Sequence, residues 1–280
     1  MNIFHLRIPD KGSLIMSSII KTGMDRSSHA INRFFEKAYA IDIHNLKQNS
    51  PLLVSGALVL GGAVWAVNDY RDWVAFGTGG TPPTPRGYLK VTLLRVANFF
   101  RYILGDDLRD ASSLPRGGPK YLQSLPMRKG GHPALKPRAL PQRQEPEYIP
   151  SIVKEKLFNL INDHASKDPD TFNIALSRTE GGTADAIYLN PDLLASNSDA
   201  KGLGGEIAHV HPSECSLHLL LSAEDARTVL EANWGKRFPI YWITPPGWIM
   251  LYAPRNEEEL ELVSRVVDAA VQFAKGTSSQ

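Results

Sequence analysis

The sequence predicts an α+β fold with a largely antiparallel sheet and packed helices, preceded by an N-terminal membrane-anchor helix. Short stretches of alternating apolar residues between residues 172 and 253 predict strands. The helical stretches around them do not alternate regularly with these strands, which favours an antiparallel sheet over a parallel one. An uncharged apolar run, Pro51–Val67, precedes the domain and predicts the anchor.

The chain of 280 residues has the composition of a globular protein, with 42% hydrophobic and 21% charged residues. Its net charge of +2 gives no indication of a polyanionic partner. The single cysteine, Cys215, excludes an intrachain disulfide, so the fold does not depend on an oxidising compartment. We divide the chain into a mobile N-terminal segment (1–50), a transmembrane helix (51–68), a linker with an amphipathic helix and a basic proline-rich arm (69–149), and an α+β domain (150–276).

The N-terminal part indicates contact with a membrane. Residues 1–50 contain an amphipathic pattern around Ser28–Ile41 but no cleavable signal sequence. The apolar run that follows is close to the lower limit of about 17 residues for a transmembrane helix. Its three glycines are more typical of membrane helices than of soluble ones, although a buried core helix is the alternative. We therefore expect contact with membrane lipid through residues 51–68, in the endoplasmic reticulum or another internal membrane, with the topology open.

The linker region combines turn-forming, helical and basic stretches. Gly77–Gly87 is rich in glycine and proline, and Tyr88–Leu104 has helical apolar spacing with three basic residues. That helix lies either on a membrane surface or against the domain. From Arg116 to Arg143 the chain has seven basic residues, five prolines and no acidic residue. Because Tyr121 is its only aromatic residue, we do not expect it to bind nucleic acid. We expect an extended arm wrapped on the domain, with an arginine reaching an anionic group of the substrate.

The domain from residue 150 onward has clear helix and strand signals. Ser151 is a predicted N-cap, Ser222 with Asp225 predicts a capping box, and Asn256 is a similar start. Gly235 is expected to end the second helix and Gly181–Gly182 to form a turn. The predicted helices are Ile152–His164, Ser222–Ala232 and Asn256–Lys275, and the predicted strands are Phe172–Leu176, Ala186–Leu189, Ile207–His211, Ser216–Ser222 and Trp248–Ala253.

Three histidines lie within ten residues in two of the predicted strands. His209 and His211 share one face of their strand because successive side chains point to opposite faces. The short connection Pro212–Cys215 has the length of a hairpin loop, which brings His218 alongside. A single histidine in a strand is more often a structural residue, but three that converge on one patch predict a functional site.

Several segments resemble the fungal luciferase family: EIAHVHP, SLHLLLS, WGKRFP and LYAPRNEEE between residues 206 and 259, and YRDWVAFG, RGYLK, YLQSLPMRKGGHP, PQRQ and DTFNIALS in the same order upstream. The resemblance implies an oxygenase, because the luciferase adds O2 to a hydroxylated styrylpyrone and forms a cyclic peroxide that emits light. The sequence departs from the luciferase pattern at three places. The loop Pro212-Ser213-Glu214 after His211 lacks an additional histidine that the luciferase pattern has there. Phe238 stands where a histidine follows the arginine, and the stretch from Pro239 to Gly247 is shorter. We therefore expect a related oxidation without light.

Two routes for such an oxidation remain open. In the metal-free route, His209 or His211 removes a proton from the substrate, and Arg255 or Arg237 stabilises the developing peroxide. In the metal route, His209, His211 and His218 bind a divalent metal, with Glu206 as a fourth ligand or a supporting residue. Trp234, Trp248 and Tyr252 are the predicted pocket walls; with Glu206 and Arg237 they complete the predicted substrate-binding residues.

The sequence thus predicts an oxygenase that uses O2 as co-substrate on an electron-rich phenolic, pyrone or polyketide-like molecule, as in fungal secondary metabolism. No flavin or nicotinamide is expected, because no glycine-rich fingerprint follows a strand. A non-catalytic protein on the same fold that binds small molecules or lipid is the alternative.

Overall fold

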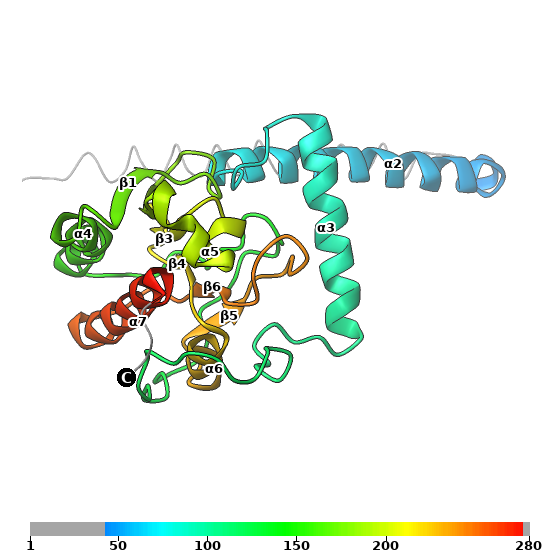
Figure 1. The fold of residues 1–280 in the computed structure, drawn as a ribbon. Coiled ribbons are helices and arrows are strands. Elements are labelled where there is room, and N and C mark those ends of the chain that lie inside the picture. Colours follow the sequence, from blue (N-terminus) through cyan, green and yellow to red (C-terminus); the bar gives the residue numbers. More distant parts are fainter. Residues whose placement is uncertain (1–42, 277–280) are drawn as a thin grey trace, which may run out of the picture. The chain divides into compact units, whose positions relative to one another are not determined.

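A computed structural model of the chain describes residues 43–276, with side chains from Ser50 onward (Figure 1). The predicted helix around Ser28–Ile41 lies outside the described residues. The chain divides into two compact units, Met1–Asn68 and Asp69–Gln280.

Helix α2 (Ile43–Phe76) contains the predicted membrane-spanning residues. Its segment Ser50–Phe76 has 27 residues and a mean hydropathy of 1.8, so it is long and apolar enough to cross a bilayer. Its large apolar side chains, including Leu52 and Leu58, are exposed. The apolar stretch stops at Asp69, whose carboxylate pairs with Arg95 and Arg138.

Helix α3 (Pro85–Ile103) confirms the helix expected at Tyr88–Leu104. It begins earlier than expected because the Thr84 hydroxyl accepts a hydrogen bond from Gly87 N, and proline is well tolerated in a first turn. Only Gly87 and Val91 are buried on this helix. Aromatic residues such as Phe99 and Phe100 are exposed, so packing on the domain accounts for only a small part of its surface.

Six antiparallel strands form one open sheet in the order β1-β2-β3-β4-β6-β5. The antiparallel sheet with packed helices confirms the α+β prediction. The strands are β1 (Phe172–Leu176), β2 (Asp185–Leu189), β3 (Glu206–Val210), β4 (Leu217–Leu220), β5 (Gly235–Arg237) and β6 (Trp248–Leu251).

Strand β5 was not predicted, because three residues are too few to show alternation. The expectation that Gly235 ends the preceding helix is wrong. That helix, α6, ends at Glu231, and Gly235 opens β5 instead. A Cβ atom at Gly235 would lie 2.6 Å from the carbonyl oxygen of Met250 on the paired strand β6. Glycine is therefore needed for the close approach of these strands.

Helices α4 (Ser151–Lys167) and α7 (Glu257–Lys275) pack against each other and against the sheet (Figure 1). Helix α6 (Ala223–Glu231) packs on β5 and β6, and the short helices η1 (Pro191–Ser196) and α5 (Ser198–Gly202) connect β2 to β3. The predicted caps are confirmed at Ser222, which accepts from Asp225 N, and at Asn256, which accepts from Glu259 N. The predicted cap at Ser151 is wrong: Pro150 is the N-cap, without a side-chain hydrogen bond.

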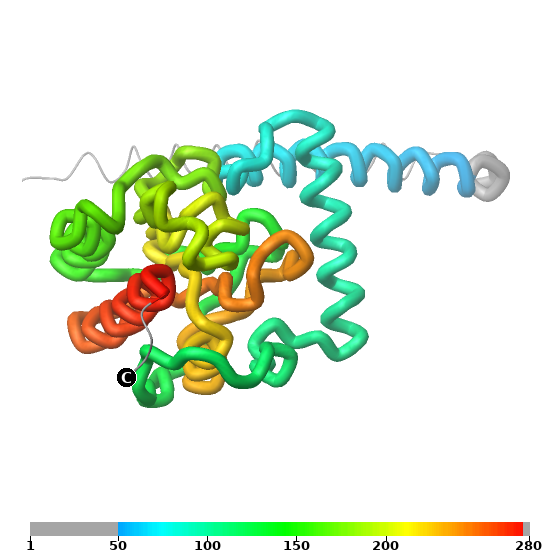
Figure 2. The backbone as a smooth tube through the Cα atoms, in the orientation of Figure 1, coloured from blue at the N-terminus to red at the C-terminus, as the bar shows by residue number. Residues whose placement is uncertain are grey.

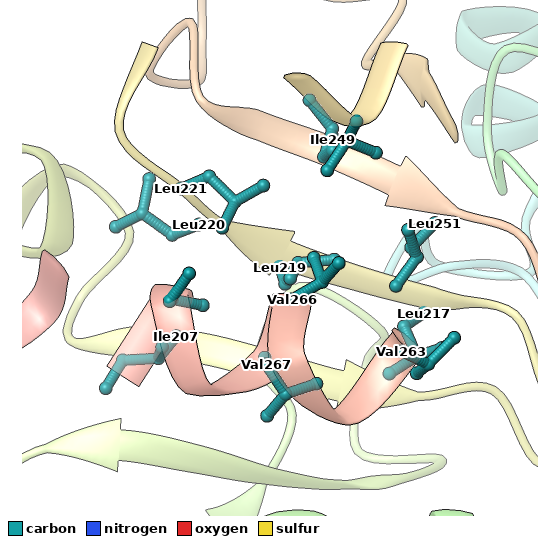
Figure 3. Close-up of a cluster of buried hydrophobic side chains, with 14 of the residues drawn as sticks. Ile207, Leu217, Leu219, Leu220, Leu221, Ile249, Leu251, Val263, Val266 and Val267 are labelled. Carbon is teal, nitrogen blue, oxygen red and sulfur yellow. The ribbon is translucent and has the colours of Figure 1, made fainter. Parts of the chain in front are cut away.

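The main core lies between α7 and the central strands (Figure 3). Helix α7 buries its apolar side there, with Val263, Val266 and Val267 near Leu217 and Leu219 of β4. Residues of the opposite parity on β4, including His218, therefore face the other side of the sheet.

We expect Leu219→Ala to lower the free energy of unfolding by about 2–5 kcal/mol, because it leaves a cavity in a close-packed core. Leu219 is fully buried. The midpoint of thermal unfolding, followed by near-UV circular dichroism, measures the effect. Leu89→Ala on α3, where the side chain is 58% exposed, is the matched control and should change the midpoint little.

The segment between α3 and α4, all of it described, forms no helix and no named strand, in agreement with the predicted extended arm (Figure 2). It returns to the domain at several points. Arg128 donates to the carbonyl of Ala253, and the Gln142 amide donates to the carbonyl of Arg237. Residues of this arm thereby reach the face of the sheet that carries His218.

Candidate functional site

The three predicted histidines meet on one face of the sheet. His209 on β3 lies directly opposite His218 on β4, and His211 follows the end of β3. All three imidazoles are buried. One nitrogen of each ring points to the same place: His209 Nε2 is 3.1 Å from His211 Nε2, which is 3.2 Å from His218 Nδ1, and His218 Nδ1 is 3.4 Å from His209 Nε2.

A fourth ligand-type side chain, Glu180, reaches this point from the turn between β1 and β2. Its Oε1 lies 3.4 Å from His211 Nε2 and 3.8 Å from His209 Nε2. The next residue, Gly181, has φ +69°, and a Cβ atom there would lie 2.7 Å from Gly80 Cα. The turn was predicted from its two glycines, but Glu180 was not predicted as a site residue, because a carboxylate beside two glycines is its only local signal.

Each histidine uses its other ring nitrogen for a buried hydrogen bond. His209 Nδ1 lies 2.8 Å from Glu206 Oε1, and His211 Nδ1 lies 2.8 Å from both Ser216 Oγ and Glu214 Oε1. His218 Nε2 lies 3.2 Å from Gln142 Oε1. These partners hold the orientation of all three rings.

Glu206 is a supporting residue on the far side of His209. Strict alternation would put residues 206 and 209 on opposite faces of β3, but the register with β2 shifts so that Tyr188 pairs with Glu206 and Ile187 with Ala208. Ile207 is thus an extra residue in a bulge, which turns Glu206 towards the imidazole. Its carboxylate also accepts hydrogen bonds from hydroxyls and main-chain amides, namely those of Ser177, Thr179, Tyr188 and Arg178.

Arg143 joins two of the buried carboxylates. Its guanidinium forms a close ion pair with Glu180 and lies 3.5 Å from Glu214 Oε2. The predicted arginine from the arm therefore reaches anionic groups of the protein in this structure. Neither Arg143 nor Gln142 was predicted, although both stand in the segment PQRQ.

The surroundings of the histidines are strongly anionic. Burial opposes ionisation of Glu206, but hydrogen bonds from His209, Thr179 and Ser177 lower its pKa to about 2. Burial likewise opposes ionisation of Glu180, but His209, His211 and Arg143 hold its pKa well below the usual range. Burial lowers the pKa of His218, and its histidine neighbours lower it further, so this ring is neutral near pH 7.

A cavity of about 350 Å³ reaches the cluster at Glu180 and His218. Trp248 and Phe238 form an aromatic wall: the Trp248 ring stacks on His218 at 5.7 Å between centroids and 21° between planes, and Phe238 meets His218 edge-on. Lys90 and Arg178 add positive charge to the lining. An anionic aromatic molecule of modest size fits this lining.

Four other predicted site residues lie outside the cluster. Arg255 pairs with Glu259 and donates to the carbonyl of Lys129, and Arg237 pairs with Asp106. Trp234 donates to the carbonyl of Pro126 and, like Tyr252, lies beside Arg128. Arg237 lines a second cavity, of about 360 Å³, which shares Phe238 and Trp248 with the first.

The chain is similar in sequence to luciferases over most of its length. A luciferase from Armillaria mellea is 30% identical over 73% of this chain and 80% of the relative. The chain belongs to the fungal luciferase family. A luciferase from Neonothopanus nambi is 27% identical over 89% of this chain and 94% of the relative, and one from Armillaria gallica is 29% identical over 73% and 80%. The family model of the luciferase domain matches residues 204–270. No solved structure matches the chain.

The matched residues of the luciferase domain include all three histidines and Trp248, but not Glu180, Gln142 or Arg143. Those three come from the segment that precedes residue 204. The site of this luciferase-family protein therefore combines residues of the matched luciferase domain with residues of the upstream arm and of the β1–β2 turn.

Proposed function

We propose that this protein is an oxygenase that adds O2 to an electron-rich phenolic, pyrone or polyketide-like small molecule. The observation that carries the proposal is the cavity beside the buried histidines, in a chain whose relatives are named luciferases. Its aromatic wall suits a planar ring, and its cationic residues favour the deprotonated substrate.

The substrate anion supplies the electrons in this reaction. An imidazole of the cluster takes the enol or phenol proton, which leaves an electron-rich anion. One electron passes to O2, the two radicals join through a new carbon–oxygen bond, and the resulting peroxide anion takes the proton back. Both oxygen atoms enter the product as a peroxide, so no external reductant is needed. Lys90 and Arg178 stabilise the anion, and the stacked Trp248 limits the access of water.

The proposed reaction is dark. Phe238 places an apolar ring edge-on to His218, at a position where the luciferase pattern has a histidine. The loss of this polar group, and of the further histidine after His211, removes hydrogen-bonding partners for a peroxide intermediate.

An oxygen electrode tests the function directly. The full-length protein, purified in detergent, is mixed with a panel of hydroxylated pyrones and phenols, and O2 uptake and light are recorded together. We expect stoichiometric uptake without light, and both atoms of labelled ¹⁸O2 in the product. Substrate binding without any O2 uptake across the panel would instead indicate a non-catalytic binding protein.

We further propose that α2 anchors the protein in an internal membrane and that α3 rests on a membrane surface. Helix α3 carries Arg86, Lys90, Arg95 and Arg101 and no acidic residue, beside exposed aromatic side chains. This combination favours contact with anionic lipid.

Replacing Leu58 and Leu60 together by arginine should move the protein from the membrane pellet to the supernatant. Each charge near the centre of a transmembrane helix costs about 2.5–3.5 kcal/mol of insertion free energy. The matched control, Leu58→Ala with Leu60→Ala, should stay in the pellet after carbonate washing. Recovery of the unchanged protein in the supernatant without detergent would rule out the anchor.

A further inference from the structure

We infer that Glu180, His209, His211 and His218 form a binding site for one divalent transition-metal ion, and that Glu206, Glu214 and Gln142 orient its histidines. The inference deepens the proposed function by naming the group that would activate O2. The metal site is inferred from the positions of the side chains and does not depend on the identity of the substrate.

The spacing of the ring nitrogens matches the coordination sphere of a metal. With metal–nitrogen bonds of about 2.1 Å, two ligand atoms lie about 3.0 Å apart at a right angle and about 3.4 Å apart at the tetrahedral angle. The three nitrogen–nitrogen distances here are 3.1, 3.2 and 3.4 Å. The four ligand atoms, including the Glu180 oxygen, all lie within 4.8 Å of one another.

The hydrogen bonds on the outer ring nitrogens leave lone pairs on the inner ones. Both oxygens of Glu206 accept hydrogen bonds from hydroxyls or main-chain amides, so His209 Nδ1 donates to this carboxylate and Nε2 carries a lone pair. The Ser216 hydroxyl donates to Glu214 and can therefore accept from His211 Nδ1. The Gln142 amide donates to the carbonyl of Arg237, which turns its oxygen towards His218 Nε2.

Three lone pairs and a carboxylate oxygen thus face one another in a buried place. A proton on His209 Nε2 would satisfy its contact with His211. That proton would leave His218 Nδ1 without a donor. One cation at the centre satisfies all four groups at once.

A divalent cation would also balance the buried charge of the cluster. The three carboxylates of Glu180, Glu206 and Glu214 are opposed by the single guanidinium of Arg143, and all four side chains are almost fully buried. With neutral imidazoles, two negative charges remain. A divalent ion neutralises them, which removes the large energetic cost of isolated buried charge.

The donor set indicates the class of metal. Three imidazoles and one carboxylate, without a cysteine, suit Fe(II), Mn(II), Co(II) or Zn(II) and disfavour Mg(II) and Ca(II), which prefer oxygen ligands. Glu180 and His218 line the cavity of about 350 Å³, so coordination positions left free by the protein would open towards it. This is the arrangement of a catalytic metal site. Glu206 is not a ligand in this scheme, because His209 stands between it and the centre.

Metal content measured on the full-length protein in detergent tests the inference without a substrate. The protein is stripped with a chelator and reloaded anaerobically with Fe(II), Mn(II), Co(II) or Zn(II), and the bound metal is measured by mass spectrometry. We expect about one tightly held ion per chain. His211→Ala and Glu180→Gln should each reduce this content severely, and Co(II) should give the visible absorption of a nitrogen–oxygen site only in the unchanged protein.

Glu206→Gln tests the positioning role of the outer carboxylate. We expect metal affinity to fall about 10–100-fold with the fold retained, and the Co(II) spectrum to shift. The matched control is His164→Ala on α4, where the histidine pairs with Asp268 at the surface; it should bind metal like the unchanged protein.

The inference is overturned if the folded, reloaded protein holds no stoichiometric metal, or if His211→Ala and Glu180→Gln bind as much as the unchanged chain. Circular dichroism confirms the fold of each variant. A protein that consumes O2 but holds no metal after reloading would disprove the metal site and leave the proposed function intact. A protein that binds metal but oxidises no member of the panel would support the metal site and contradict the proposed function.

Discussion

Replacing His209 and His211 together by alanine should lower kcat/KM for O2 uptake by about 10²–10⁴-fold, the range for loss of a catalytic acid–base group. Both proposed roles of these residues, as metal ligands or as proton acceptors, place them beside the reacting atoms. The measurement is the initial rate in the oxygen electrode with a substrate identified from the panel.

The fold of the double variant is checked by near-UV circular dichroism. Alanine at these positions removes two buried imidazoles but leaves the α7 side of the sheet, where the main core lies, unchanged. His164→Ala should retain full activity. Unchanged O2 uptake by the double variant would show that the histidines take no part in the reaction.

The second large effect concerns Arg143. Its guanidinium is buried and touches both Glu180 and Glu214. We expect Arg143→Met to lower the free energy of unfolding by about 3–5 kcal/mol, because it leaves two buried carboxylates without their cation. For a domain of this size, this corresponds to a drop of about 10 °C in the unfolding midpoint.

A second substitution separates charge from packing. Adding Glu214→Gln to Arg143→Met removes one of the uncompensated charges and should recover part of the lost unfolding temperature. Arg138→Met is the matched control, because Arg138 pairs with Asp69 and not with Glu180 or Glu214. We expect it to lower the unfolding midpoint less than Arg143→Met. If Arg143→Met and Arg138→Met lower the unfolding midpoint equally, and Glu214→Gln recovers none of the loss, Arg143 stabilises the fold through packing.

Much of the domain was predictable because local signals and tertiary packing agree. The Ser222 and Asn256 caps, the apolar stripe of α7 and the alternation in β3 and β4 each follow from hydrogen-bonding capacity or residue spacing within a few positions. The same alternation puts His209 and His211 on one face, and the hairpin register, which pairs His209 with His218, puts His218 on that face too.

The surroundings of the histidines follow from contacts between distant segments. Glu180 comes from another hairpin, Gln142 and Arg143 come from an arm without regular structure, and Glu206 reaches His209 only because a bulge at Ile207 breaks the alternation. Sequence spacing carries no information about any of these approaches. The sequence alone thus indicates the hairpin of β3 and β4 and the imidazoles that share its face, through short-range periodicity. Only the tertiary structure brings the carboxylates and the arginine to the histidines. The charge balance of a buried site depends on residues from distant segments, which meet only when the chain is folded.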